Sequence, residues 1–251
     1  MSKTFLIDTT LCTACRGCQV ACKQWHDLPA EKTRNMGSYQ NPADLSYTTY
    51  KLVRMTEEEI GGKLHWLFFP DQCRHCIEAP CLETAYDENA IYRDEATGAV
   101  LYTQATKALD AEEIIGSCPY NIPRAGLDGT LTKCDMCNDR IHNGLKPACV
   151  TTCPTGTMNF GERDEMLALA ETRLKKVKQR YPKAMLLDPD DLNVIYLTAF
   201  DPALYSEYAV ADAGRSPRKA SASRIAASDK NMTRSEAIRK MMGPFGKLMK
   251  A

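Results

Sequence analysis

The sequence of 251 residues lacks the features that would place the chain in a membrane or give it a nucleotide cofactor. No apolar run approaches the roughly 20 residues that a membrane helix needs, so we expect no membrane span. The first residues show no signal-peptide architecture, so we expect any export to depend on another protein. No Walker or dinucleotide glycine motif is present, and we therefore expect no direct NAD or flavin site.

Net charge is also absent, because 32 basic residues balance 32 acidic ones, but the charges are unevenly distributed. Residues 213–251 contain ten Lys or Arg and two Asp or Glu, which leaves +8 there and −8 in residues 1–212. We expect the basic tail, residues 209–251, to be disordered when free or bound to a partner subunit, and we expect no nucleic-acid partner. Thr233 and Glu236 resemble a capping box, which predicts a short helix in that tail.

Cysteine, in contrast, is abundant, with twelve residues. An even number could form six disulfides, but such frameworks belong to small secreted chains with export signals. Two-residue spacings favour shared metal centres instead. Zinc also uses C-x2-C pairs, although it usually draws on two separated pairs. A zinc-stapled interaction module therefore remains the alternative to iron–sulfur clusters.

The first and last cysteine groups predict two clusters. Residues 12–22 form a C-x2-C-x2-C-x3-C run, although Lys23 rather than proline follows it. In bacterial two-cluster ferredoxins the first three cysteines of such a run bind one cluster and the fourth reaches the other. This crossover assigns Cys12, Cys15, Cys18 and Cys153 to cluster A. It assigns Cys22, Cys134, Cys137 and Cys149 to cluster B.

The middle cysteines predict a third cluster beside a vacant site. No cysteine occupies position 85, where a C-x3-C spacing from Cys81 would place one, and a lone cysteine precedes Pro119. The crossover assigns Cys73, Cys76, Cys81 and Cys118 to cluster C. If no insertion separates residues 108 and 118, the vacant positions are Ala85, Ala108, Ala111 and Ile114. The four positions that lack a cysteine all belong to one predicted site, and the other three sites keep all four ligands. We therefore predict three 4Fe-4S clusters.

These groups predict an α+β fold built from two nested bacterial ferredoxin-like units, with short strands and helices around the clusters. Residues 1–50 and 125–165 would form the outer unit with two clusters, and residues 51–124 the inner unit with one. Residues 162–208 would add a helix and a strand that pack on this core, before the extended tail.

Local patterns predict the main elements. A helix is expected over Glu162–Tyr181, where Pro182 ends it, and an irregular loop over Trp25–Tyr50. Strands are expected at Lys3–Asp8, at Lys51–Met55 and His65–Phe69 around a Gly-Gly turn, at Ile91–Tyr92 and Val100–Tyr102 as a second hairpin, and at Asn193–Phe200.

Several residues near the cysteines could influence the cluster sites. His75 lies between two cysteines, but the thiolates already suffice, so we expect it to support the site or to be exposed. Arg74, Lys23 and Lys133 adjoin ligands and would either raise a cluster's potential or be solvated. Trp25 and Trp66 are expected to pack rather than relay electrons.

The cysteine layout resembles the iron–sulfur subunit of the molybdopterin oxidoreductase family over about residues 4–208. The segments that carry the resemblance are CTACRGCQVACKQW, FFPDQCRHCIEAPC, CPYNIPR, KCDMC and PACVTTCPTGTMNFG. Many members have four motifs and four clusters. Three clusters without a membrane helix resemble the small (beta) subunit of soluble periplasmic tungsten or molybdenum formate dehydrogenases.

This resemblance implies a heterodimer in which a large subunit holds a tungsten or molybdenum bis-pterin site. Formate would be oxidised to carbon dioxide there, or the reverse, and this chain would hold no pterin and no catalytic residue. The chain would carry electrons to an external carrier such as a cytochrome c. The resemblance also implies a periplasmic location, reached with the partner subunit's twin-arginine signal. A cytoplasmic location, or the same role in a sulfur- or nitrogen-oxyanion reductase, remains the alternative.

Overall fold

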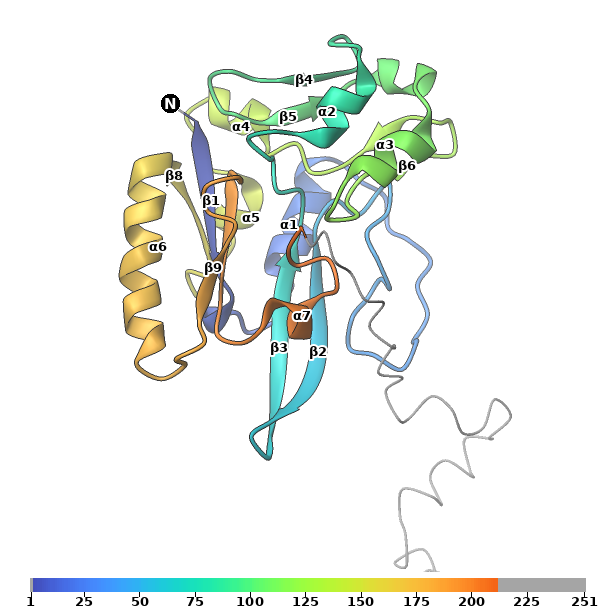
Figure 1. Cartoon of the computed structure of the whole chain (residues 1–251). Coiled ribbons are helices and arrows are strands. Elements are labelled where there is room, and N and C mark those ends of the chain that lie inside the picture. The colour runs from blue at the N-terminus through green and yellow to red at the C-terminus, as the bar shows by residue number, and fades with distance from the viewer. Residues whose placement is uncertain (1, 212–251) are drawn as a thin grey trace, which may run out of the picture. The chain divides into compact units, whose positions relative to one another are not determined.

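The segment KTFLID forms an inner strand of a four-stranded sheet in the computed structural model, which describes residues 2–211 (Figure 1). The strands are β1 (Lys3–Asp8), β8 (Met158–Glu162), β9 (Met185–Leu187) and β10 (Val194–Thr198). Their order is β8-β1-β10-β9, and β1 pairs antiparallel with β8 and parallel with β10. The pairing of β1 with β8 therefore joins the first and last cysteine groups.

The two faces of this sheet have different partners because successive side chains of a strand point to opposite sides. Leu6 and Ile195 pack with Ala170 of helix α6 (Arg163–Lys178). Phe5 and Tyr196 belong to a larger apolar cluster that includes cysteines of the first and last groups. Helix α6 thus covers one face of the sheet, and the cysteine-bearing segments lie against the other (Figure 1).

A long hairpin leads into the second cysteine group. It consists of β2 (Leu52–Ile60) and β3 (Lys63–Asp71), paired in register from Leu52 opposite Asp71 to Ile60 opposite Lys63. Gly61 and Gly62 both have positive φ, of 60° and 74°, as a two-residue hairpin turn requires. The hairpin is confirmed but is longer than predicted, because its paired strands continue past the buried residues into solvent.

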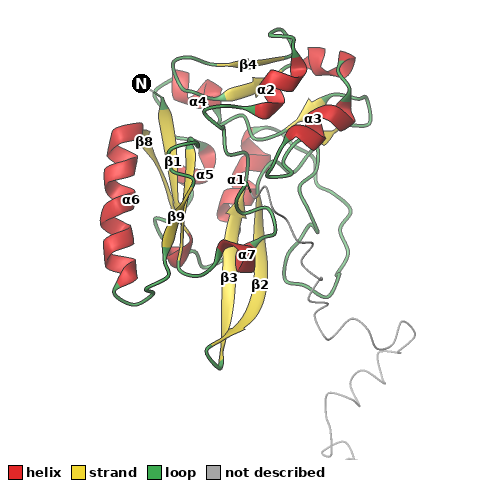
Figure 2. Ribbon diagram, viewed as in Figure 1, coloured by secondary structure: helices red, strands yellow, loops and turns green. Residues whose placement is uncertain are grey.

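Short elements surround the remaining cysteines (Figure 2). The helices are α1 (Gly17–Trp25), α2 (Pro80–Ala85), α3 (Ala111–Ser117), α4 (Asn138–His142), α5 (Ala148–Thr151) and α7 (Pro202–Tyr205), with 3-10 turns η1 (Thr9–Leu11) and η2 (Gln104–Ala108). The two-stranded sheets are β4 (Ile91–Arg93) with β5 (Val100–Tyr102), and β6 (Arg124–Ala125) with β7 (Leu131–Thr132). Helix α1 packs on α5, and α2 packs on α3.

Most of the predicted elements are confirmed. The strand Lys3–Asp8 matches its predicted bounds, and the second hairpin lies where it was expected. The helix expected over Glu162–Tyr181 runs from Arg163 to Lys178, and the late strand is Val194–Thr198. The fold is α+β, as predicted. No helix among residues 2–211 is long and apolar enough to cross a membrane. The basic tail and its capping box lie outside the described residues, apart from residues 209–211.

Candidate metal centres

All twelve cysteines lie within the described residues, and each has a free thiol. Eleven of them are buried or partly buried, Cys15 is exposed, and none is disulfide-bonded. The disulfide framework considered from the even count is therefore wrong for this structure. Free thiols gathered from separate segments are the donor set that a metal or cluster site requires.

Three of the four C-x2-C pairs, Cys12/Cys15, Cys73/Cys76 and Cys134/Cys137, form the same turn. Ala14, His75 and Met136 precede the second cysteine of their pairs and have positive φ values of 53°, 46° and 66°. The His75 and Met136 backbone N–H groups each donate to the sulfur of the preceding cysteine at 3.4 Å. Such left-handed backbone outside glycine costs on the order of 1–3 kcal/mol and concentrates at functional sites. Backbone donors to sulfur stabilise the negative charge that a bound cluster places there.

The four cysteines expected for cluster C line one pocket. They are Cys73, Cys76, Cys81 and Cys118. Burial and the three neighbouring thiols raise the pKa of Cys76 to about 12. Helix α2 carries Cys81 and Cys118 directly follows helix α3, so the packing of these helices brings the two segments together.

The cysteines expected for cluster A meet where β1 and β8 pair. Strand β1 runs through η1 directly to Cys12, and Cys153 precedes β8. Burial raises the pKa of Cys18, and the nearby Cys15 and Cys153 raise it further, although Lys51 opposes the shift. Burial raises the pKa of Cys12 to about 11, with smaller contributions from Cys18 and Cys15.

The cysteines expected for cluster B meet where α1 packs on α5. Burial raises the pKa of Cys134 well above its ordinary value, and the neighbouring Cys22 and Cys137 add to the shift. Burial also raises the pKa of Cys149, which Cys137 and Cys22 reinforce. Raised pKa values keep these thiols neutral in the protein alone, and a bound cation would reverse that preference.

The three groups lie in a row. Besides its own group, Cys149 is close enough to Cys18 for that charge to raise its pKa. Cys134 is likewise influenced by Cys73. The group expected for cluster B therefore lies between the other two.

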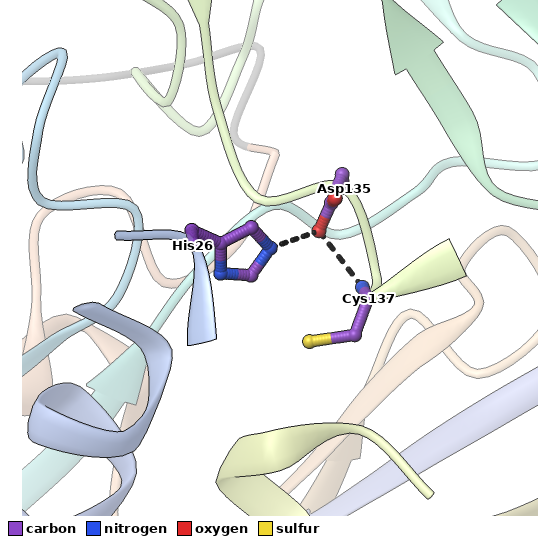
Figure 3. A group of neighbouring side chains, drawn as sticks. All are labelled: His26, Asp135 and Cys137. Atoms are coloured by element: carbon purple, nitrogen blue, oxygen red, sulfur yellow. Dashed lines mark hydrogen bonds and ion pairs between the residues drawn. The ribbon is translucent and has the colours of Figure 1, made fainter. Parts of the chain in front are cut away.

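A polar triad that the sequence did not reveal lies beside Cys22 and Cys137. His26 Nε2 donates to Asp135 Oδ1 at 2.9 Å, and the same oxygen accepts the Cys137 N–H at 2.8 Å (Figure 3). His26 Nδ1 contacts the Cys22 carbonyl oxygen at 2.8 Å. Burial lowers the pKa of His26, but hydrogen bonds with Asp135, Cys137 and Cys22 outweigh it and raise the pKa.

The side chains of His26, Asp135 and Cys137 are close enough to one another to hold a metal ion themselves. Cys137 is already assigned to cluster B, however, so we interpret His26 and Asp135 as supports for that site. Their spacing of 109 residues left no local signal in the sequence.

The expected vacant site is filled by apolar packing, with one exception. Ala85, Ala111 and Ile114 belong to a single apolar cluster. Ala108 is exposed at the end of η2 and does not belong to that cluster. The prediction that all four positions converge is therefore wrong for Ala108, because the 3-10 turn η2 carries it to the surface.

Of the three charged residues expected beside ligands, Arg74 and Lys133 are buried and Lys23 is partly exposed. Arg74 is 1% exposed and Lys133 is 6% exposed, and His75 is fully buried. Burial, together with the charges of Lys133 and Arg93, lowers the pKa of His75 well below its ordinary value. The alternative of a solvent-exposed His75 is therefore wrong.

The two tryptophans, in contrast, lie at the surface. Trp25 is 42% and Trp66 is 54% exposed. Trp25 packs under the Arg140 guanidinium at 4.1 Å, and Trp66 against the ring of Tyr39 at 5.3 Å. Both make packing contacts, as expected, but not in the core.

Comparison with known proteins points to iron–sulfur chemistry. A family model described as a 4Fe-4S dicluster domain matches residues 64–163, which contain eight of the twelve cysteines. The chain is 61% identical over 215 residues to the formate dehydrogenase subunit beta of Megalodesulfovibrio gigas, and the match covers 84% of this chain and 100% of that protein.

Two further relatives have similar names. The formate dehydrogenase 2 subunit beta (cytochrome c-553) of Nitratidesulfovibrio vulgaris is 55% identical over 216 residues, covering 83% of this chain and 99% of the relative. The iron–sulfur subunit of the nitrate-inducible formate dehydrogenase of Escherichia coli is 41% identical over 207 residues, covering 80% and 70%. These matches favour iron over zinc as the metal for the thiol groups.

Proposed function

We propose that this chain, which belongs to the family of iron–sulfur (beta) subunits of formate dehydrogenases, conducts electrons through three 4Fe-4S clusters. The observation that carries the count is the gathering of twelve free thiols into three neighbouring groups of four, one of which lines a single cavity. Each cubane needs four thiolate ligands, so the donor set fits three clusters without remainder. The clusters supply one-electron transfer, and the chain's own residues hold and insulate them.

The proposed ligand sets follow the crossover. Cluster A is held by Cys12, Cys15, Cys18 and Cys153. Cluster B is held by Cys22, Cys134, Cys137 and Cys149. Cluster C is held by Cys73, Cys76, Cys81 and Cys118. The outer unit, residues 1–50 and 125–165, would contain A and B, the inner unit, residues 51–124, would contain C, and residues 162–208 would cover the outer unit.

The row of cysteine groups supports a linear route from A through B to C. Electrons would enter at A from a large subunit with a tungsten or molybdenum bis-pterin site, where formate is oxidised. This chain would hold no pterin, flavin or NAD. The names of the relatives support formate as the substrate of that partner, and we propose a heterodimer that is exported to the periplasm.

Charge distribution supports a basic carrier at the C end of the route. Residues 76–130 contain ten Asp or Glu and three Lys or Arg, so they hold −7 of the −8 in residues 1–212. Glu83 on α2 and Glu112 and Glu113 on α3 are exposed beside the helices that supply cluster C ligands. Such a concentration of one sign steers an oppositely charged partner toward the site. A basic cytochrome c fits this surface, and the name of the Nitratidesulfovibrio vulgaris relative includes a cytochrome c-553.

Iron analysis of the purified complex tests the cluster count. Three clusters require about twelve iron atoms per chain, beyond those of the large subunit. Cys118→Ala should lower this to about eight, whereas Ser117→Ala, one residue away, should leave it unchanged. About sixteen iron atoms, or abundant zinc, would contradict the assignment. Formate-dependent dye reduction by the co-purified large subunit tests the substrate, and activity only on a sulfur or nitrogen oxyanion would contradict it.

The carrier is tested by charge reversal. Glu112→Lys with Glu113→Lys should slow reduction of a basic monohaem cytochrome c and weaken its dependence on salt. Glu57→Lys with Glu59→Lys, on exposed positions of β2, is the matched control. Formate-dependent reduction of a small viologen dye should be unchanged in both variants. Equal slowing in both pairs would reject the acidic surface as the docking site.

A further inference from the structure

His75, which lines the pocket expected for cluster C, has an unpartnered ring nitrogen among the described residues. The Val100 N–H donates to His75 Nδ1 at 3.1 Å, so this nitrogen is an acceptor and has no proton. In a neutral imidazole the proton then resides on Nε2. His75 lines the cavity together with the four cysteines.

The Nε2 atom is buried and has no hydrogen-bond partner in residues 2–211. A buried donor without an acceptor loses the free energy of its hydration, so such atoms in native proteins call for an explanation. The acceptors missing from the protein alone are those a cluster would bring, namely its inorganic sulfides and its thiolate ligands.

Tyr102 provides a second donor of the same kind. Its hydroxyl is buried and meets no nitrogen or oxygen partner within the described part of the chain. Tyr102 and Cys81 pack against the same apolar cluster, which also contains Val100. Lys133 Nζ lies 4.7 Å from the centre of the Tyr102 ring.

Strand β5 organises both donors. Val100 and Tyr102 are two residues apart in β5, so their side chains point to the same face of the strand. The Val100 N–H fixes the orientation of the His75 ring, and Tyr102 packs against the same apolar cluster as Cys81. Two of the five buried orphan polar atoms in the described chain thus adjoin one cysteine group.

We propose that the His75 Nε2–H and the Tyr102 Oη–H donate hydrogen bonds to cluster C and thereby raise its reduction potential. The inference rests on the proposed function, because it requires a 4Fe-4S cluster in this cavity. Reduction adds one negative charge to a cluster, so donors fixed at its surface stabilise the reduced form more than the oxidised form. A higher potential at cluster C favours electron flow along the row toward the carrier end.

The test is a potentiometric titration followed by electron paramagnetic resonance on the complex with its catalytic subunit. Cys118→Ala identifies the signal of cluster C by its loss. His75→Leu should lower the midpoint of that signal by about 59 mV, which is a tenfold change for one electron. Tyr102→Phe should lower the same midpoint, and His75→Gln, which restores a donor, should recover most of the loss.

Matched controls separate the hydrogen bonds from general effects. His65→Leu alters a histidine on β3 that packs against Phe200, and Tyr92→Phe alters an exposed tyrosine on β4. Both should leave the cluster C midpoint unchanged. An unchanged midpoint in His75→Leu and Tyr102→Phe, with iron still near twelve per chain, would overturn the inference while leaving the proposed function intact.

A spectroscopic measurement keeps the inference testable if His75→Leu fails to assemble the cluster. Pulsed electron paramagnetic resonance of the reduced, unmodified complex with ¹⁵N-labelled histidine should show nitrogen coupling to cluster C. His75→Gln should abolish this coupling. Absence of that coupling would overturn the role of His75. Iron well below twelve per chain in the unmodified complex would overturn the proposed function itself.

Discussion

Arg74 and Asp71 form an ion pair of 2.8 Å in which both side chains are only 1% exposed. The second carboxylate oxygen of Asp71 accepts a hydrogen bond from Arg54 at 2.6 Å. The Arg74 guanidinium also lies 4.6 Å from the ring centre of Tyr196, on the central sheet. The pair therefore ties the end of the hairpin to the sheet at the point where the second cysteine group begins.

Asp71→Asn should destabilise the protein by about 3–5 kcal/mol, because it leaves the buried Arg74 cation without its counter-ion. The expected readout is a lower urea midpoint for bleaching of the cluster absorption. Asp128→Asn breaks the exposed pair with Lys107 and is the control, for which no change is expected. Equal midpoints for the two variants would show that the buried pair does not stabilise this region.

Lys51→Met should lower the reduction potentials of clusters A and B. The Lys51 side chain is buried, and its ammonium donates to two uncharged oxygens, Pro70 O and Gln72 Oε1. Burial lowers its pKa, but the nearby Cys18 and Cys149 outweigh burial and raise it. A fixed positive charge between two clusters stabilises their reduced forms, and its removal should disfavour reduction.

Potentiometric titration of the complex measures this effect, with Lys63→Met at the exposed hairpin turn as the control. A midpoint shift confined to cluster C would contradict the position inferred for Lys51.

Ile114→Ala should destabilise the inner unit by about 2–5 kcal/mol, the usual cost of truncating a buried isoleucine. Ile114 is 2% exposed and packs in the apolar cluster that contains Ala85. The urea midpoint should fall, whereas Leu127→Ala, at a residue 96% exposed, should not change it. An unchanged urea midpoint in Ile114→Ala would mean that apolar packing at the vacant site does not stabilise the protein.

Glu31→Gln should speed proteolysis of the long loop between α1 and β2 several-fold at pH 8. Glu31 Oε1 accepts hydrogen bonds from Ser46 Oγ at 2.6 Å and Thr48 Oγ1 at 3.1 Å, and from the Thr49 hydroxyl. Burial raises the pKa of Glu31, but these hydroxyls and Lys23 outweigh burial and lower it.

A lowered carboxyl pKa contributes stability that is complete above the ordinary value and is lost as the pH falls through the folded-state value. The full effect of Glu31→Gln is therefore expected at pH 8. Glu88→Gln, at an exposed position outside this loop, is the control. Equal cleavage rates at pH 8 in the Glu31 variant and the unmodified chain would contradict the anchoring role.

The elements with local signals could be predicted well. Lys3–Asp8 is a short apolar run, and the Gly61-Gly62 pair marks a two-residue hairpin turn, so both follow from neighbouring residues alone. The expected continuation of the ferredoxin motif to Ala108 failed, because Ala108 lies exposed at the end of the 3-10 turn η2 and not in the apolar cluster. The spacing of the motif gives no sign of that turn.

The sequence by itself determined which residues can hold clusters, because three cysteines in a tight turn are brought together by the local backbone. The tertiary structure alone decided what surrounds them. His26 meets Asp135, and His75 meets Val100, through contacts between distant segments that leave no spacing pattern. Burial of a histidine, a lysine or an arginine is likewise a property of the packed chain, since a charged or polar residue gives no sign in the sequence of the side chains that will enclose it.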